Sequence, residues 1–235
     1  MDFVIRTAAA CVAMAFLASC AYEGDYEHPV ARKLSWFSYL SGDDLRAACK
    51  AGAPDRIRLV YNAIYTEQVR SYDIGPSAEP GRYDMTARVT GTADLSSFTT
   101  ELGAPDPFKP WRPAKSVTSL RAEDLVNLKL ALEADGFFEP TRVGLELPSH
   151  NFYWIGAACI DGHYHFNGFL WPEDQIEKFL FPKMLFAWDF TGVPVAKPRK
   201  ATLFDIYGTE YPDRNQNIFS VKLAQNGLWR LTVPN

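Results

Sequence analysis

The chain has 235 residues, 47% of them hydrophobic and 14% aromatic, which is enough apolar material for a packed core and excludes global disorder. Its 24 basic and 28 acidic side chains give a formal charge of −4. The chain therefore has neither the basic surface that nucleic-acid binding requires nor a polybasic patch for lipid head groups. The length fits one generous domain better than two small ones.

Residues 1–20 have the pattern of an export signal. Arg6 is followed by an apolar run over residues 7–17, whose length is typical of a signal peptide. A helix of that length rises only about 16 Å, roughly half of the hydrocarbon core, so it does not form a stable membrane span. The run ends in Leu17-Ala18-Ser19-Cys20, where small residues directly precede a cysteine. This ending resembles the lipobox of bacterial lipoprotein precursors.

The lipobox resemblance implies how the chain is processed and where it resides. In that class the signal peptide, here residues 1–19, is removed, and the sulfur of Cys20 receives a diacylglyceryl group. Ala21 stands where the class places its aspartate signal for inner-membrane retention, so the resemblance implies the outer membrane, facing the periplasm. Several acyl chains together anchor a protein stably. The expected partner is therefore the membrane, with another envelope protein as a further candidate. The alternative is an ordinary secretory signal without lipid.

The four cysteines divide by position. Cys11 leaves with the signal peptide and Cys20 is the lipidation site, so Cys49 and Cys159 remain in the mature chain. In an oxidising periplasm two such thiols most simply form a disulfide. The long loop between them corresponds to roughly 4–5 kcal/mol of stabilisation in the chain-entropy description. The alternative is a pair of buried free cysteines.

The mature chain is predicted to consist of a lipid-anchored tether, residues 20–33, and a single α+β domain, residues 34–235. The tether shows no hydrophobic periodicity. The domain has strands, a helix, a hairpin, a further helix and a closing hairpin in that order. This order predicts an α+β fold, with mostly antiparallel sheet built from hairpins and a few packing helices.

The first half of the domain is predicted to contain a short helix and two strands. Ser41 is expected to cap a helix that runs to about residue 50. Residues 56–74 alternate apolar and polar side chains with a period of two, which predicts a strand with a bulge or bend near Glu67. Residues 82–90 are predicted to form a second strand, antiparallel to the first.

The second half is predicted to contain two hairpins and two helices. A leucine face predicts a helix over residues 121–134. Asp161-Gly162 is a preferred two-residue turn for a hairpin over residues 152–170. A helix is expected after this hairpin, interrupted at Pro182. The chain is predicted to close with a hairpin around a three-residue loop at residues 225–227.

The register of the predicted 152–170 hairpin assigns its side chains to two faces. Cys159 lies opposite Tyr164 and points into the core, toward the helix that carries Cys49. Ala158 lies opposite His165, on the other face. That second face is expected to be polar and partly exposed.

The histidines of this second face are the candidate metal site. Residues two apart on a strand point the same way and lie roughly 6.5 Å apart. His163 and His165 could therefore share a zinc ion, with His150 as a third ligand. The structural alternative is a polar face with two hydrogen-bonded histidines. No common catalytic or cofactor motif is present in the sequence, so the chain is expected to bind no cofactor. Zinc, in a metal-assisted hydrolase, is the alternative.

Residues 120–185 resemble emfourin-type protease inhibitors in the order of their predicted elements. These are a leucine helix ending in Gly136-Phe137-Phe138, an aromatic strand, a histidine-bearing strand and another helix. The resemblance implies a protease-inhibitor-like module, and no inhibitory residue is matched.

The sequence as a whole predicts a lipid-anchored envelope protein with a binding or structural role rather than an enzyme. This prediction rests on an anchor, a tether and an aromatic-rich domain without catalytic motifs. The metal-assisted hydrolase and the inhibitor-like module are the alternatives.

Overall fold

A computed structural model describes residues 22, 24, 26, 28–91, 111–202 and 219–232; Cys20 and the predicted signal peptide, residues 1–19, lie outside them. The helices are α2 (Pro29–Ser41), α3 (Asp43–Ala48), α4 (Ala122–Ala134) and α5 (Phe181–Trp188), with a 3-10 turn at Ile176–Lys178. The strands are β1 (Arg56–Ala63), β2 (Gln68–Pro76), β3 (Arg82–Gly91), β4 (Ala114–Arg121), β5 (Glu146–Pro148), β6 (Phe152–Ile160), β7 (His163–Leu170), β8 (Ser220–Ala224) and β9 (Gly227–Thr232).

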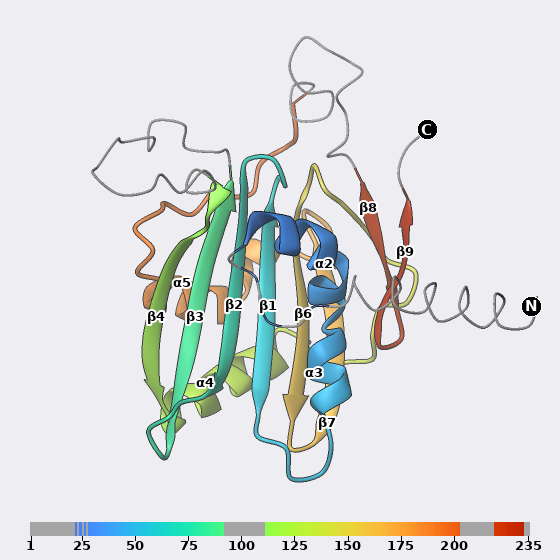
Figure 1. The fold of residues 1–235 in the computed structure, drawn as a ribbon. Coiled ribbons are helices and arrows are strands. Elements are labelled where there is room, and N and C mark those ends of the chain that lie inside the picture. Colours follow the sequence, from blue (N-terminus) through green and yellow to red (C-terminus); the bar gives the residue numbers. More distant parts are fainter. Residues whose placement is uncertain are drawn as a thin grey trace, which may run out of the picture.

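The described strands form two antiparallel sheets. Sheet A has the order β4-β3-β2-β1-β6-β7, and the smaller sheet B has the order β5-β8-β9. Neighbouring strands in both sheets run antiparallel (Figure 1). The predicted α+β fold, with antiparallel sheets built from hairpins and a few packing helices, is therefore confirmed.

Strands β1 and β2 form a hairpin, so the single bent strand predicted over residues 56–74 is wrong. The amides of Glu67 and Gln68 both donate to the carbonyl of Ile64, which has a positive φ of 59°. Glu67 interrupts the apolar alternation, and a charged residue is better solvated in an exposed turn than in a bulge within a buried strand. The strand predicted over residues 82–90 is present as β3 and pairs with β2.

The hairpin of β6 and β7 has the predicted register. Cys159 pairs with Tyr164, and Ala158 pairs with His165, across the Asp161-Gly162 turn. Helix α3 packs against β6 and brings Cys49 to Cys159. The two cysteines form a disulfide with a Cα–Cα distance of 5.5 Å and a sequence separation of 110. The predicted disulfide is confirmed.

Helices cover both faces of sheet A. Helices α2 and α3 lie on one face, and α4 and α5 lie on the other (Figure 1). Because side chains alternate along a strand, Leu59 of β1 packs with the α4 side while its neighbour Val60 packs with the α2 side. Helix α4 is present as predicted, and its buried face consists of Leu125, Leu128, Ala131 and Leu132.

The face of β7 that carries His163, His165 and Asn167 is partly exposed, as predicted: His163 is exposed and His165 is half-buried, whereas Asn167 is buried. Phe138 packs edge-to-face on His165, with ring centroids 4.9 Å apart. Asn167, in the same row of side chains, is 1% exposed and donates to the carbonyl of Phe137. A Cβ at Gly156 would lie 2.7 Å from the Phe137 ring, so glycine at this position lets the segment after α4 lie directly on the sheet.

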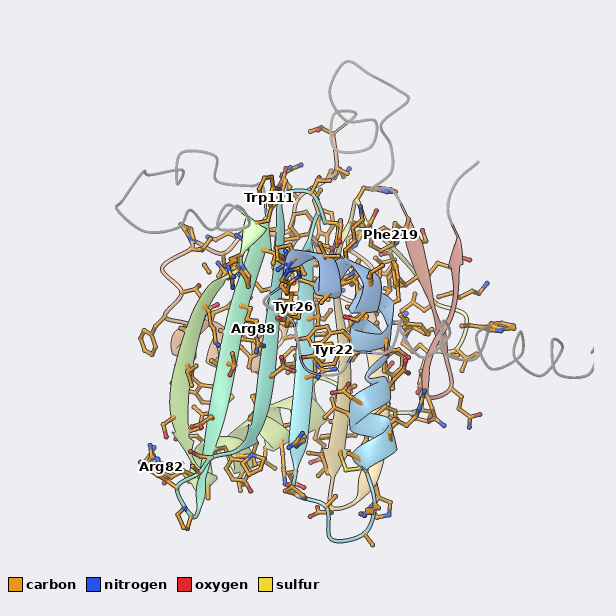
Figure 2. The ribbon with its side chains drawn as sticks, in the orientation of Figure 1. Tyr22, Tyr26, Arg82, Arg88, Trp111 and Phe219 are labelled. Atoms are coloured by element: carbon orange, nitrogen blue, oxygen red, sulfur yellow. A yellow bond between two sulfur atoms is a disulfide. The ribbon has the colours of Figure 1, made fainter. Side chains whose placement is uncertain are left out.

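Within the predicted tether over residues 20–33, several of the residues that the structure describes pack against the domain or lie in a helix. Helix α2 already begins at Pro29, and Tyr26 is only 1% exposed. Figure 2 shows Tyr22 and Tyr26 lying over the sheet beside α2. The guanidinium of Arg58 lies 4.9 Å from the centre of the Tyr22 ring. Burial of aromatic rings and cation–π attraction explain why a segment without periodicity nevertheless packs.

The prediction that Ser41 caps the following helix is wrong, because Ser41 is the last residue of α2. Gly42, with a φ of 65°, separates α2 from the short helix α3. A Cβ at Gly42 would lie 2.4 Å from the Cβ of Ala157 on β6. Glycine therefore provides both the left-handed backbone and the close approach of the helix pair to the sheet.

Two predictions in the C-terminal part are corrected. The helix expected between the β6–β7 hairpin and Pro182 is present only as the 3-10 turn at Ile176–Lys178. Pro182 stands in the first turn of α5, where proline is tolerated, and the further short turn expected through Trp188 is this helix. In the closing hairpin, Val221 pairs with Leu231 as predicted, but the turn is two residues long. A register shift after Lys222 compensates for the shorter turn and leaves Trp229 63% exposed.

Candidate ligand-binding site

A cavity of about 480 Å³ lies on the α5 side of sheet A, and we call it the apolar cavity. Its volume is within the range of small-molecule sites. Its lining comes from β1, β6, the region of the 3-10 turn, α5 and the segment that follows α5. The lining residues are Tyr61, Trp154, Trp171, Ile176, Glu177, Phe179, Pro182, Lys183, Phe186, Val195, Ala196, Lys197 and Pro198.

Aromatic rings from three elements form one side of the apolar cavity. Tyr61 on β1 stacks on Trp154 on β6, with centroids 4.9 Å apart and planes inclined by 26°. Phe186 on α5 packs against both of them, 6.0 Å from Tyr61 and 5.9 Å from Trp154. These contacts hold the rings in defined positions before any ligand arrives.

Helix α5 is held in place by a side-chain cap from the end of α4. The carboxylate of Asp135 accepts hydrogen bonds from the amides of Leu180, at 2.6 Å, and Phe181, at 2.9 Å. These amides are among the unsatisfied donors of the helix start, where a negative charge also interacts favourably with the helix dipole. Phe181 is fully buried and packs edge-to-face on Trp154, at 5.0 Å.

Residues 193–198 form the opposite side of the apolar cavity, and we call them the wall segment. The side chain of Gln68 binds this segment twice, donating to the Pro194 carbonyl at 2.9 Å and accepting from the Ala196 amide at 3.0 Å. The Tyr61 hydroxyl donates to the Ala196 carbonyl at 2.9 Å. Side chains of sheet A thus satisfy backbone groups of the wall segment, which has no regular structure of its own.

A buried ion pair between Arg70 and Asp189 connects the wall segment to α5. Their side chains are 1% and 3% exposed. Arg70 also donates to the Val193 carbonyl, and the Tyr72 hydroxyl donates to Asp189 at 2.9 Å. Burial by itself raises the pKa of Asp189, but hydrogen bonds from Thr191 and Tyr72 and the charge of Arg70 outweigh it and hold that pKa below its ordinary value.

The rim of the apolar cavity carries charge. Lys183 of α5 and Lys197 of the wall segment are exposed, as is Glu177 of the 3-10 turn. Within the described ranges, neither lysine forms an ion pair. The cavity therefore combines an aromatic interior with two cationic side chains and one acidic side chain at its edge.

The structure does not assemble the predicted three-histidine site. His163 and His165 are two residues apart on β7, but His150 precedes β6 at the far end of the hairpin, roughly 30 Å away along the strand. Among the described residues, no group of three or more histidine, cysteine, aspartate or glutamate side chains is arranged to hold a metal ion. The two ends of the hairpin are separated by the full length of β6, which the sequence spacing does not reveal.

His165 instead lines a second cavity of about 400 Å³, together with Phe138, Glu139 and Tyr164. Burial lowers the pKa of His165 below its ordinary value, and the nearby His163 lowers it further. The imidazole is therefore neutral near pH 7 and packs on Phe138. This environment suits a packing role for His165.

A second ionic cluster lies on the opposite face of sheet A and has a structural role. Arg58 binds Asp44 through two hydrogen bonds, at 2.7 and 2.9 Å, and Asp73 through a third, at 2.7 Å. Arg88 and the Tyr39 hydroxyl also bind Asp73. These contacts connect α2 and α3 to β1, β2 and β3, and they line no comparable apolar space.

Sequence reasoning missed the residues of the apolar cavity. They belong to separate segments, and each has an ordinary explanation by itself as core, turn or surface. Gln68 and Arg70 could have indicated that another segment packs here, because both are polar and lie on β2, a strand whose two faces are both buried. Buried polar groups require partners. Here those partners are the wall segment and Asp189.

No family model, curated protein or solved structure matches the chain. No helix in the described part of the chain is long and apolar enough to cross a membrane.

Proposed function

We propose that this chain is a lipid-anchored protein of the bacterial cell envelope whose folded domain binds a small apolar ligand and acts by binding rather than by catalysis. The observation that carries the binding role is the apolar cavity. Its aromatic side is packed and its wall segment is hydrogen-bonded to sheet A, so the site is formed in advance. Concave, mostly apolar and largely preformed spaces are the usual small-molecule sites of proteins.

Two features support the location. The residues Leu17-Ala18-Ser19-Cys20 resemble a lipobox, which implies an acylated Cys20 in the outer membrane, facing the periplasm. The Cys49–Cys159 disulfide is typical of chains that fold in an oxidising compartment such as the periplasm.

The binding role is tested with a neutral fluorescent probe, N-phenyl-1-naphthylamine, and the full-length chain purified as Cys20→Ser, which carries no acyl group. Saturable binding of one probe per chain, with quenching of tryptophan fluorescence, is expected. Ala196→Trp fills the apolar cavity while the backbone bonds of residue 196 to Gln68 and Tyr61 are kept, and this change should abolish binding. Ala47→Trp, on the exposed surface of α3, is the matched control and should bind normally.

The outcomes separate the binding role from the location. Absence of saturable binding, or equal binding by the Ala196→Trp and Ala47→Trp variants, would show that the apolar cavity is not a ligand site. The location is tested independently by mass spectrometry of the protein from native envelopes. The expected first residue is an acylated Cys20, and any other N-terminus contradicts lipid anchoring.

A further inference from the structure

We propose that the ligand of the apolar cavity is a single-chain amphiphile with an anionic head group, chemically a long-chain fatty acid. This proposal rests on the binding role proposed above and specifies the class of ligand. The hydrocarbon chain lies among the aromatic rings, and the carboxylate lies at the rim between Lys183 and Lys197.

The interior of the cavity favours a hydrocarbon chain because it is lined mainly by aromatic and aliphatic side chains and because the polar side chains of sheet A beside it are already engaged. The Tyr61 hydroxyl donates to Ala196, and both ends of the Gln68 amide bind the wall segment. Arg70 is occupied by Asp189 and Val193. A polar ligand placed there would lose its hydrogen bonds to water without replacement, at a substantial cost in free energy, whereas a hydrocarbon chain has none to lose.

The rim favours an anionic head group. Two lysines and one glutamate line it, and the lysines form no ion pair within the described ranges. A lysine presents its ammonium group on a flexible stem that packs on apolar surface while the charge stays in water. Lys183 and Lys197 come from different elements, α5 and the wall segment, and both line the same cavity. A cationic head group would face two like charges.

The size of the cavity favours one chain over two. A volume of about 480 Å³ is in the lower half of the range for small-molecule sites. A two-chain phospholipid would need a larger space or would leave one chain in water. A single-chain carboxylate has half as much hydrocarbon to place in the cavity and keeps its charge at the rim.

The experiment compares palmitate with hexadecanol, which has the same chain length and no charge. Each displaces N-phenyl-1-naphthylamine from the full-length Cys20→Ser chain. Palmitate is expected to bind more tightly than hexadecanol. The double variant Lys183→Gln with Lys197→Gln should weaken palmitate binding by about 2- to 30-fold, the combined effect of two exposed charge contacts, and leave hexadecanol binding unchanged.

The matched control is Lys33→Gln with Lys50→Gln, which removes two exposed lysines near the other face of sheet A and should change neither affinity. Equal affinity of the unmodified chain for palmitate and hexadecanol would overturn the proposal, as would equal loss of palmitate binding in both double variants. Either result with the probe still bound leaves the binding role standing. Failure of the probe to bind removes both proposals.

Discussion

The Arg70–Asp189 pair provides a sharp test of how the wall of the apolar cavity is held. Asp189→Asn keeps the size of the side chain and removes its charge. Both partners are almost completely buried, at 1% and 3% exposure, and breaking one partner of such a pair costs about 3–5 kcal/mol. Arg70 keeps its hydrogen bonds to Gln68 and to the Val193 carbonyl, which places the expected loss near the lower end, about 3 kcal/mol.

The assay is equilibrium unfolding in urea, monitored by tryptophan fluorescence, which gives the free energy of unfolding. In a thermal melt of a chain of this size, the same loss of about 3 kcal/mol lowers Tm by roughly 6–12 °C. The matched control is Glu146→Gln, which removes the charge from an ion pair with Lys222 whose side chains are 53% and 34% exposed. That change should cost about 0.5 kcal/mol or less. A loss below about 1 kcal/mol for Asp189→Asn, no larger than the control, would refute the structural role of the pair.

Three further predictions follow from the same structure. Replacing Cys49 and Cys159 together by alanine should lower the free energy of unfolding by about 2–5 kcal/mol in urea titrations, and an unchanged midpoint would contradict this. Because the pKa of Asp189 is lowered in the folded protein, its carboxylate stabilises the fold above about pH 4, and this contribution is lost as pH falls through the folded pKa. The free energy of unfolding of Asp189→Asn, measured against pH, should lack this acid-dependent part. NMR titration should find the pKa of His165 below 6.5 and higher in His163→Gln; an unshifted value would contradict the described packing.

Local sequence patterns predicted the elements whose signals are short-range. The Asp161-Gly162 turn set the register of β6 and β7, because a two-residue turn determines which residues lie opposite one another. The leucine spacing of α4 predicted its buried face in the same way. The disulfide followed from the count of cysteines and the register that points Cys159 toward α3. The lipobox resemblance needs no tertiary structure to be recognised, and acylation of Cys20 stays a prediction.

Tertiary packing determined the features that depend on contacts between distant segments. The packing of Tyr22 and Tyr26 comes from Arg58 and the sheet, which a tether without periodicity does not indicate. His150 and His163 lie at opposite ends of the β6–β7 hairpin, because His150 precedes β6 and His163 follows the turn at its other end. The apolar cavity is formed by residues of the 3-10 turn, α5, the wall segment and two strands of sheet A. No local pattern encodes such a site, since each residue contributes only a surface whose opposite side is supplied by another part of the chain.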